Sequence, residues 1–339
     1  MDLFLPAEWH EQCGVQLTWP HESSDWAPIL DEVRRCYVAI AREIVKREKL
    51  LIVCHSIEEV KKDLDGISFD HILFREIPSN DTWARDHGAI TVIEDGTPFL
   101  CDFQFNGWGM KFASNWDNQI TKELYQSALF HDNVAYKGYL HFVLEGGSIE
   151  SDGKGTILTT RECLMSVNRN EQLSQEEIEA CLSISLGAKR FLWLNNGYLA
   201  GDDTDSHVDT LARFCNENTI AYVQCSDEND EHFHALHQME LELKKFRTIE
   251  GNPYNLIPLP LPTPCYYDGE RLPATYANFL IMNNAVLVPI YCCETDEIAL
   301  RQLEKAFPDR EIVGIDCRVL IKQHGSLHCV TMQYPKGLF

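Results

Sequence analysis

Several features that mark particular classes of protein are missing from this sequence. No apolar run approaches the roughly 20 residues that a membrane-spanning helix needs, and the segment Met1–Glu8 is acidic and lacks a signal-peptide pattern. We therefore expect a cytoplasmic protein with no membrane partner. No low-complexity linker or shift of composition divides the chain, so residues 1–339 are predicted to form a single domain.

Positive charge is also scarce. Lysine and arginine number 29 against 52 acidic residues, which gives a formal net charge of −23. Such a chain repels nucleic acids and anionic membrane surfaces, so neither is expected as a partner. The charge favours a small cationic ligand, although solubility alone would explain it equally well.

The thirteen cysteines include no CxxC pair. Several, such as Cys54 and Cys101, lie in apolar runs typical of buried strands, and in a cytosolic protein they are best interpreted as free thiols. His232, His234 and His237 lie in an acidic helical stretch with no suitable cysteine and no i, i+4 histidine pair. A solvated helix face is therefore predicted there, and we expect no metal site.

Apolar patterning predicts a mixed α/β chain. Residues Trp26 to Ile44 carry apolar side chains on one helical face, and Leu50–Cys54 is a continuous apolar run typical of a buried strand. The alternation of helix and strand then continues along the chain. Further strands are predicted at 72–74, 89–93, 99–105, 139–144, 191–194, 219–225, 312–316 and 319–321, hairpins at 148–160 and 276–291, and helices at 115–130, 174–186, 231–246 and 297–307.

Polar residues whose side chains can take part in catalysis or binding lie at the ends of several of these segments, namely Asp86, Glu145, His207, Asp209 and Cys329. The steps from Asp86 to Glu145, to His207 and to Cys329 are 59, 62 and 122 residues, the last being two steps of roughly 61. Such regular spacing is typical of a repeated, closed architecture. Five units of this length would fill the chain.

Each of these residues also has a purely structural interpretation. Cys329 could be a packed, inert thiol, Asp86 could pair with Arg85, and Glu145 could accept backbone N–H groups beside the two glycines that follow it. His207 could be a histidine at the start of a helix, and Asp209 could be a first-turn charge favoured by the helix dipole. Five separate structural explanations are harder to accept than one shared site that holds a nucleophile, a histidine and three carboxylates.

Four motifs carry a resemblance to a known family: Asn80-Asp81-Thr82-Trp83-Ala84-Arg85-Asp86, Glu145-Gly146-Gly147, Gly201-Asp202-Asp203-Thr204-Asp205-Ser206-His207-Val208-Asp209 and Gly325-Ser326-Leu327-His328-Cys329-Val330-Thr331. In this order they resemble the agmatine deiminase family, which includes bacterial peptidylarginine deiminase-like proteins of the guanidino-group-modifying superfamily. The resemblance covers nearly the whole chain. The last motif departs from the family's usual Gly-Gly-Asn-Ile-His-Cys.

The resemblance implies a five-bladed, pseudo-symmetric α/β-propeller of ββαβ units, the pentein fold. It also implies hydrolysis of agmatine to N-carbamoylputrescine and ammonia without a cofactor, through a covalent thiouronium intermediate. By the same resemblance Cys329 is the nucleophile and His207 the general acid and base. Asp86 and Asp209 clamp the guanidinium, and Glu145 orients His207. A homo-oligomer is an open possibility.

The resemblance also suggests which residues line the pocket. Trp83 and Trp108 are expected to form its walls, and Asp205 is a candidate for binding substrate. Asn106-Gly107-Trp108-Gly109 forms a glycine-rich loop with an apparently exposed tryptophan. This loop is interpreted either as a mobile active-site loop or as an ordinary turn.

Other functions stay open at this stage. The same superfamily includes enzymes that act on free or peptidyl arginine and amidinotransferases, and a non-catalytic module that binds guanidino ligands is a further alternative. A papain-like hydrolase is disfavoured because no Cys-Trp motif lies near the N-terminus. The acidic residues near the motifs outnumber the basic ones, which favours the dication agmatine over arginine: Asp81, Asp102, Asp202, Asp203 and Asp205 stand against Arg85 and Lys111.

Overall fold

Residues 3–339 are described by a computed structural model, which confirms the mixed α/β class. The strands form five sheets of three or four strands and one two-stranded ribbon within this range. The sheets contain, in strand order, β1 (Leu3–Phe4), β5 (Ile90–Glu94), β6 (Thr97–Gln104) and β7 (Ala135–Val143); β10 (Arg190–Leu194), β9 (Thr156–Thr160) and β8 (Ile149–Ser151); β11 (Ala212–Asn216), β12 (Thr219–Gln224) and β13 (Asn255–Pro260); β14 (Tyr266–Tyr267) and β15 (Glu270–Arg271); β16 (Leu280–Met282), β17 (Ala285–Ile290) and β18 (Glu311–Asp316); and β19 (Thr331–Pro335), β2 (Gln12–Thr18), β3 (Lys49–Cys54) and β4 (Ile72–Glu76).

The five larger sheets share one strand arrangement. In each, an antiparallel pair is followed by a parallel pair, as in β16–β17 and β17–β18. The parallel partner is always reached through at least one helix, because a parallel connection must cross from one end of the sheet to the other. The antiparallel pair that contains β19 and β2 joins the two ends of the chain in one sheet. None of the described sheets closes on itself.

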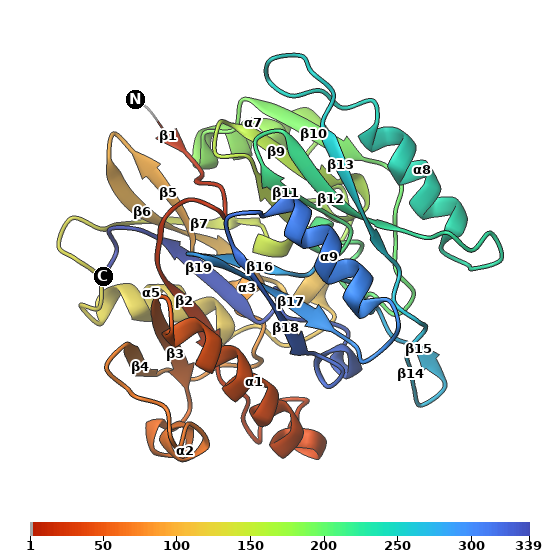
Figure 1. Cartoon of the computed structure of the whole chain (residues 1–339). Helices are drawn as coiled ribbons and strands as arrows, with labels where there is room; N and C mark the ends of the chain where they lie inside the picture. Colours follow the sequence, from red (N-terminus) through yellow and green to blue (C-terminus); the bar gives the residue numbers. More distant parts are fainter. Residues whose placement is uncertain (1–2) are drawn as a thin grey trace.

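The helices are α1 (Leu30–Val45), α2 (Ile57–Asp63), α3 (Ala84–His87), α4 (Gly107–Met110), α5 (Asp117–Gln126), α6 (Arg161–Leu164), α7 (Gln175–Leu186), α8 (Phe233–Leu243) and α9 (Asp296–Ala306), with 3₁₀ turns η1 (Ala27–Ile29), η2 (Gly146–Ser148), η3 (Val208–Thr210) and η4 (Leu320–Gln323). Figure 1 shows α1, α5, α7 and α8 toward the outside of the molecule and α3 toward its middle. The longer helices bury one apolar face against the sheets, as Tyr37 and Ile40 of α1 do.

Short helical turns, rather than long helices, carry the polar residues at the strand ends. Asp86 belongs to α3, Glu145 precedes η2, and Asp209 belongs to η3. The turn α3 packs against η2, and η2 packs against η3. The packing brings together segments that are more than 100 residues apart in sequence.

Three local predictions were wrong. Residues 319–321 are not a strand but enter the turn η4, because the N–H groups of Leu320 and Ile321 bond back to the carbonyl of Cys317. Trp108 is not exposed but is 5% accessible and packs against Phe105. His232 is buried rather than solvated, since Asp230 and the Ala200 N–H bond its two ring nitrogens.

Among residues 3–339, no helix has both the length and the apolar character to cross a bilayer.

Candidate active site

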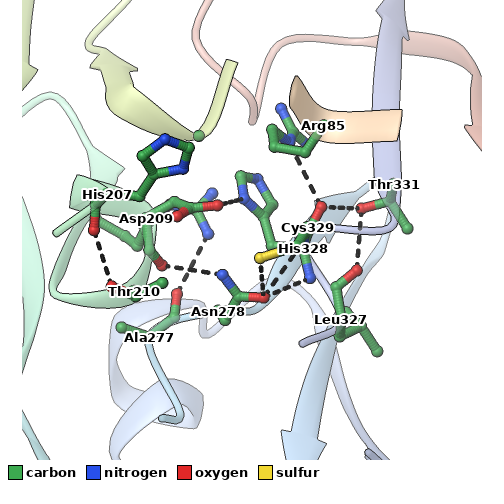
Figure 2. Close-up of polar contacts among 12 residues, drawn as sticks. Arg85, His207, Asp209, Thr210, Ala277, Asn278, Leu327, His328, Cys329 and Thr331 are labelled. Atoms are coloured by element: carbon green, nitrogen blue, oxygen red, sulfur yellow. Dashed lines mark hydrogen bonds and ion pairs between the residues drawn. The ribbon is translucent and has the colours of Figure 1, made fainter. Parts of the chain in front are cut away.

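Cys329 lies at the centre of a group of buried polar side chains (Figure 2). Its thiol donates a hydrogen bond to Asn278 Oδ1, 3.3 Å away. Burial raises the pKa of Cys329 well above its ordinary value, and the carboxylates of Asp209 and Asp86 raise it further. In the ligand-free site Cys329 is therefore held as the neutral thiol, and a nearby cation would be needed to favour the thiolate.

Asp86 lies against Trp108 and the glycine pair. The Trp108 indole N–H donates to its Oδ2 at 2.9 Å, and the Gly147 N–H donates to its Oδ1 at 3.0 Å. Burial raises the pKa of Asp86, against the opposing effect of His207. A Cβ at Gly147 would come within 2.6 Å of His207 Nδ1 and 3.1 Å of Asp209 Oδ2. Only a glycine leaves room for these side chains to converge.

Asp209 offers one free oxygen to the site. Its Oδ2 is 2.7 Å from His328 Nδ1, whereas its buried Oδ1 has no hydrogen-bond partner among the described residues. Burial opposes ionisation, but the hydrogen bond and charge of His328 prevail and lower the pKa of Asp209. The free oxygen is therefore an anionic acceptor that a ligand N–H can use.

His207 has unsatisfied ring nitrogens, because neither Nδ1 nor Nε2 has a hydrogen-bond partner of good geometry in the described chain. Its Nδ1 lies 3.7 Å from Asp86 Oδ1. Burial alone would lower the pKa of His207, but Asp86, Cys163 and Glu145 together raise it well above its ordinary value. These neighbours favour the imidazolium, the form that can give a proton away.

Glu145 is fully buried, but its hydrogen bonds go elsewhere. Arg169 Nε donates to both of its oxygens, at 2.9 and 3.0 Å. The carboxylate lies near His207, and a ligand atom of each residue and of Cys163 falls within 4.8 Å of the other two. Within residues 3–339 no Glu145–His207 hydrogen bond is present, so the role of Glu145 in orienting His207 stays a prediction.

A pocket with about 380 Å³ of empty space opens above Cys329 and Asp86. Trp83 and Trp108 form part of its wall. A Cβ at Gly325 would come within 2.2 Å of the Trp83 ring, which explains a glycine at this position. The complete lining comprises Asp25, Asp81, Trp83, Asp86, Trp108, Phe112, Asp203, Thr204, Gln323, His324, Gly325 and Cys329.

Asp205 does not line this pocket. Its oxygens are engaged by Arg169 Nη1 at 2.6 Å and by Lys111 Nζ at 2.9 Å. These ion pairs lower its pKa even though partial burial opposes them. Asp205 therefore helps to hold Arg169, which in turn bonds Glu145. The nearby Asp203, and not Asp205, borders the pocket.

Several residues of this region were not singled out from the sequence. His328 bridges two carboxylates, with Asp209 Oδ2 on Nδ1 and Glu8 Oε2 on Nε2, both at 2.7 Å. This geometry suits an imidazolium, which donates from both nitrogens. Arg213 in turn donates to Glu8 Oε2 at 2.8 Å. Only the position of His328 beside Cys329 could have indicated such a role.

Two groups of side chains have the composition of metal ligands among residues 3–339, namely Glu145 with Cys163 and His207, and Glu8 with Glu150 and His328. In the first group Arg169 bonds Glu145, and in the second Arg213 bonds both glutamates. An additional cation would meet a guanidinium at either place, so neither group is a favourable metal site.

Comparison with known proteins identifies the family. The sequence model of the Porphyromonas-type peptidyl-arginine deiminases matches residues 4–335. This chain belongs to that family. Among members with solved structures, a Porphyromonas gingivalis protein described as "Putative Arginine Deiminase" is 53% identical and superposes with a TM-score of 0.96, covering 100% of both chains.

Other relatives carry the name agmatine deiminase. A cysteine-to-serine variant of C. jejuni agmatine deiminase with substrate bound is 41% identical and has a TM-score of 0.93, covering 100% of this chain and 98% of that one. A Vibrio parahaemolyticus protein named "Putative agmatine deiminase" is 34% identical over 98% of this chain and 96% of its own length. The names of these relatives thus divide between arginine and agmatine.

Proposed function

We propose that this protein hydrolyses a guanidino group to a ureido group and ammonia, with agmatine as the preferred substrate. The observation that carries the proposal is the placement of Asp86 and the free oxygen of Asp209 beside a buried thiol and a buried histidine whose ring nitrogens are unsatisfied. Carboxylates bind the N–H groups of a planar cation through charge-assisted hydrogen bonds. The names of the relatives support the same chemistry.

In the proposed mechanism, substrate binding prepares the nucleophile. The guanidinium held by Asp86 and Asp209 brings a positive charge next to Cys329, and this charge offsets the two carboxylates that raise the pKa of the thiol. The thiol proton then leaves to solvent, and the thiolate attacks the guanidinium carbon to form a tetrahedral adduct. The planar clamp holds the carbon close to the sulfur.

His207 handles the protons of the following steps. As an imidazolium it protonates a departing nitrogen, and the C–N bond breaks to release ammonia and leave a thiouronium on Cys329. The neutral His207 then takes a proton from water while the oxygen attacks the same carbon. In the collapse of this second adduct the C–S bond breaks, the hydroxyl proton of the adduct passes to the sulfur, and the ureido product is released.

The pocket charges favour agmatine over arginine. Asp25, Asp81 and Asp203 line the pocket together with Asp86, and none of its lining residues is a lysine or an arginine. Burial raises the pKa of Asp81 to about 7 and that of Asp203 to about 6. Carboxylates that are costly to ionise without a partner gain most from a second cation on the substrate. The α-carboxylate of arginine would instead be repelled.

Arginine is the second candidate because of one comparison. The 53% identical relative is described as an arginine deiminase. His324 lines the pocket and is the only basic side chain in its described lining that could meet a carboxylate, although its Nδ1 lies 2.7 Å from the carbonyl oxygen of Gly201. A single histidine would pair an arginine carboxylate only in its protonated form.

We also propose that the five sheets are the five blades of a propeller around this site. The recurrence of an antiparallel pair followed by a helix and a parallel partner supports five equivalent ββαβ units. The predicted step of roughly 61 residues between strand-end residues agrees with this repeat.

Ammonia release from agmatine, free arginine, a peptidyl arginine and a plain peptide tests the function directly. The wild-type protein is expected to release ammonia from agmatine at least tenfold more efficiently, measured as kcat/KM, than from arginine. Comparable efficiency with arginine would reject the charge argument. Absence of ammonia release from every guanidino compound would favour the non-catalytic binding module.

A further inference from the structure

A second cavity, separate from the active-site pocket, also borders α3. Arg85 lines this cavity, whereas its neighbour Asp86 lines the active-site pocket, and the two cavities share no lining residue. The second cavity has about 620 Å³ of empty space including its mouth. We call it the Arg85 cavity; its walls come from the segment 5–12, the start of β5, β8 and β19.

The walls of the Arg85 cavity hold polar atoms without hydrogen-bond partners in the described chain. Gln12 Oε1, Arg85 Nη2 and Thr91 Oγ1 are all buried and unpartnered, and these residues are 6%, 4% and 5% accessible. Gln333 Oε1 is a fourth such atom, on a partly exposed side chain. Buried polar groups without partners are costly, so this wall favours a ligand that satisfies them.

Arg85 is especially short of partners for a buried guanidinium. Its Nε lies 3.5 Å from the His328 carbonyl oxygen, and its Nη1 lies 3.6 Å from Met332 Sδ. Its Nη2 is 3.8 Å from Glu8 Oε2, which is too far for a hydrogen bond. At least one strong N–H donor is therefore available to an acceptor oxygen in the cavity.

The formal charges around the cavity are already balanced. Glu8 and Glu150 line it, and both are bonded by Arg213. Arg85 is in the wall and Arg213 lies behind it, so these four side chains carry two positive and two negative charges, and the paired His328 and Asp209 behind Glu8 add no net charge. A charged ligand would add an uncompensated charge to a buried place, whereas an uncharged one would not.

We propose that the Arg85 cavity binds a small uncharged compound with a carbamoyl or amide group. The carbonyl oxygen of such a group accepts from Arg85, and its N–H groups donate to the oxygens of Gln12 and Gln333. The Thr91 hydroxyl can bond either the carbonyl oxygen or an N–H group of the compound, since a hydroxyl both donates and accepts. This site is separate from the active site and does not depend on the proposed reaction.

Three planar probes of similar size test the chemistry: urea, acetate and guanidinium. Crystals of the full-length protein are soaked in a concentration series of each, and the refined occupancy in the Arg85 cavity gives a dissociation constant that belongs to this site alone. Urea is expected to lie between Arg85 and Gln12, with at least tenfold tighter binding than either charged probe. Water alone at saturating urea, or equal binding of a charged probe, overturns the proposal.

Two near-isosteric variants test which atoms bind urea. Thr91→Val and Gln333→Met each remove one unpartnered polar atom and are expected to weaken urea binding about five- to tenfold. Thr121→Val is the matched control, because Thr121 Oγ1 is also buried and unpartnered but lies on α5, outside the cavity. Gln333 is only partly buried, so its variant is expected to fold. Wild-type affinity in both cavity variants also overturns the proposal.

Discussion

Buried charge is treated in opposite ways in two neighbouring regions of this protein. In the Arg213 network, made of Glu8, Glu150, Arg213 and His328, every charged side chain bonds a partner of opposite charge. Among residues 3–339, the only cationic side chain within salt-bridge distance of the pocket carboxylates Asp81, Asp86 and Asp203 is that of His207, which lies 3.7 Å from Asp86.

The pKa shifts of Glu8 and of the pocket carboxylates record this difference, whereas burial raises the pKa of Glu150 in spite of Arg213. Burial opposes ionisation of Glu8, but Arg213 and His328 prevail and lower its pKa. Burial instead raises the pKa of Asp81 to about 7 and also raises that of Asp86. Asp209 joins the two regions, with one oxygen on His328 and the other free. The charges of the Arg213 network are thus neutralised within the protein, whereas the carboxylates of the pocket need a cation from outside.

The largest expected effect is the loss of turnover in Cys329→Ser. A serine alkoxide is far less accessible than a thiolate at neutral pH, so kcat is expected to fall on the order of 10⁴-fold or more. Ammonia release measures it, and thermal unfolding checks that the variant is folded. Cys101→Ser is the matched control, since its buried thiol faces the Ser185 carbonyl, which a hydroxyl can also bond. Full activity in Cys329→Ser would show that Cys329 is not the nucleophile.

Breaking the Arg213 network is expected to cost stability. Arg213→Met leaves Glu8 and Glu150 buried without their main partner, and the loss of one member of a buried ion pair costs about 3–5 kcal/mol. Denaturant unfolding measures the change. Arg318→Met is the control, because its ion pair with Asp316 is largely exposed and such pairs contribute about 0–1 kcal/mol. Equal losses in both variants would contradict the contrast between the regions.

Removing a pocket carboxylate is expected to weaken catalysis. Asp86→Asn loses a charge-assisted contact to the guanidinium, which is worth about 1.5–3 kcal/mol. We therefore expect kcat/KM for agmatine to fall by roughly 10- to 100-fold or more. Asp102→Asn is the control, since this buried carboxylate lies outside the pocket and accepts from the Tyr136 hydroxyl. A change below twofold in Asp86→Asn would place Asp86 outside the site.

Lower pH is expected to weaken agmatine binding. Burial raises the pKa of Asp81 to about 7 and that of Asp203 to about 6, so both carboxyls become protonated as the pH falls through this range. Only the ionised forms attract the substrate's second cation, so KM is expected to rise about tenfold between pH 8 and pH 6. Asp81→Asn is expected to flatten this dependence. A KM that is constant over this range in the wild type would contradict it.

The smallest expected effect comes from salt. Raised ionic strength screens the attraction between an acidic pocket and a dication, and the Debye length falls from about 10 Å at 0.1 M to about 3 Å at 1 M. KM for agmatine is expected to rise about threefold over that range, while KM for arginine changes less. Parallel measurements on both substrates decide the matter, and an equal response would argue against charge as the basis of selectivity.

Sequence patterns were sufficient for the class of fold. Strands and helices with one apolar face are local features, so their periodicity was visible in the chain. Asp86, His207, Asp209 and Cys329 were singled out by their places at segment ends and by the motifs around them, and the structure brings these side chains together. Residues 319–321 were misjudged because three apolar residues are too few to show a period.

The sequence alone determined which chemical groups this protein possesses and their order along the chain. Tertiary structure alone decided their partners: Glu145 with Arg169, His328 between Asp209 and Glu8, and Asp205 with Arg169 rather than with the pocket. The bonded pair of Glu8 and His328 is separated by 320 residues. Contacts over such distances depend on how the sheets pack, and local patterns carry no record of that packing.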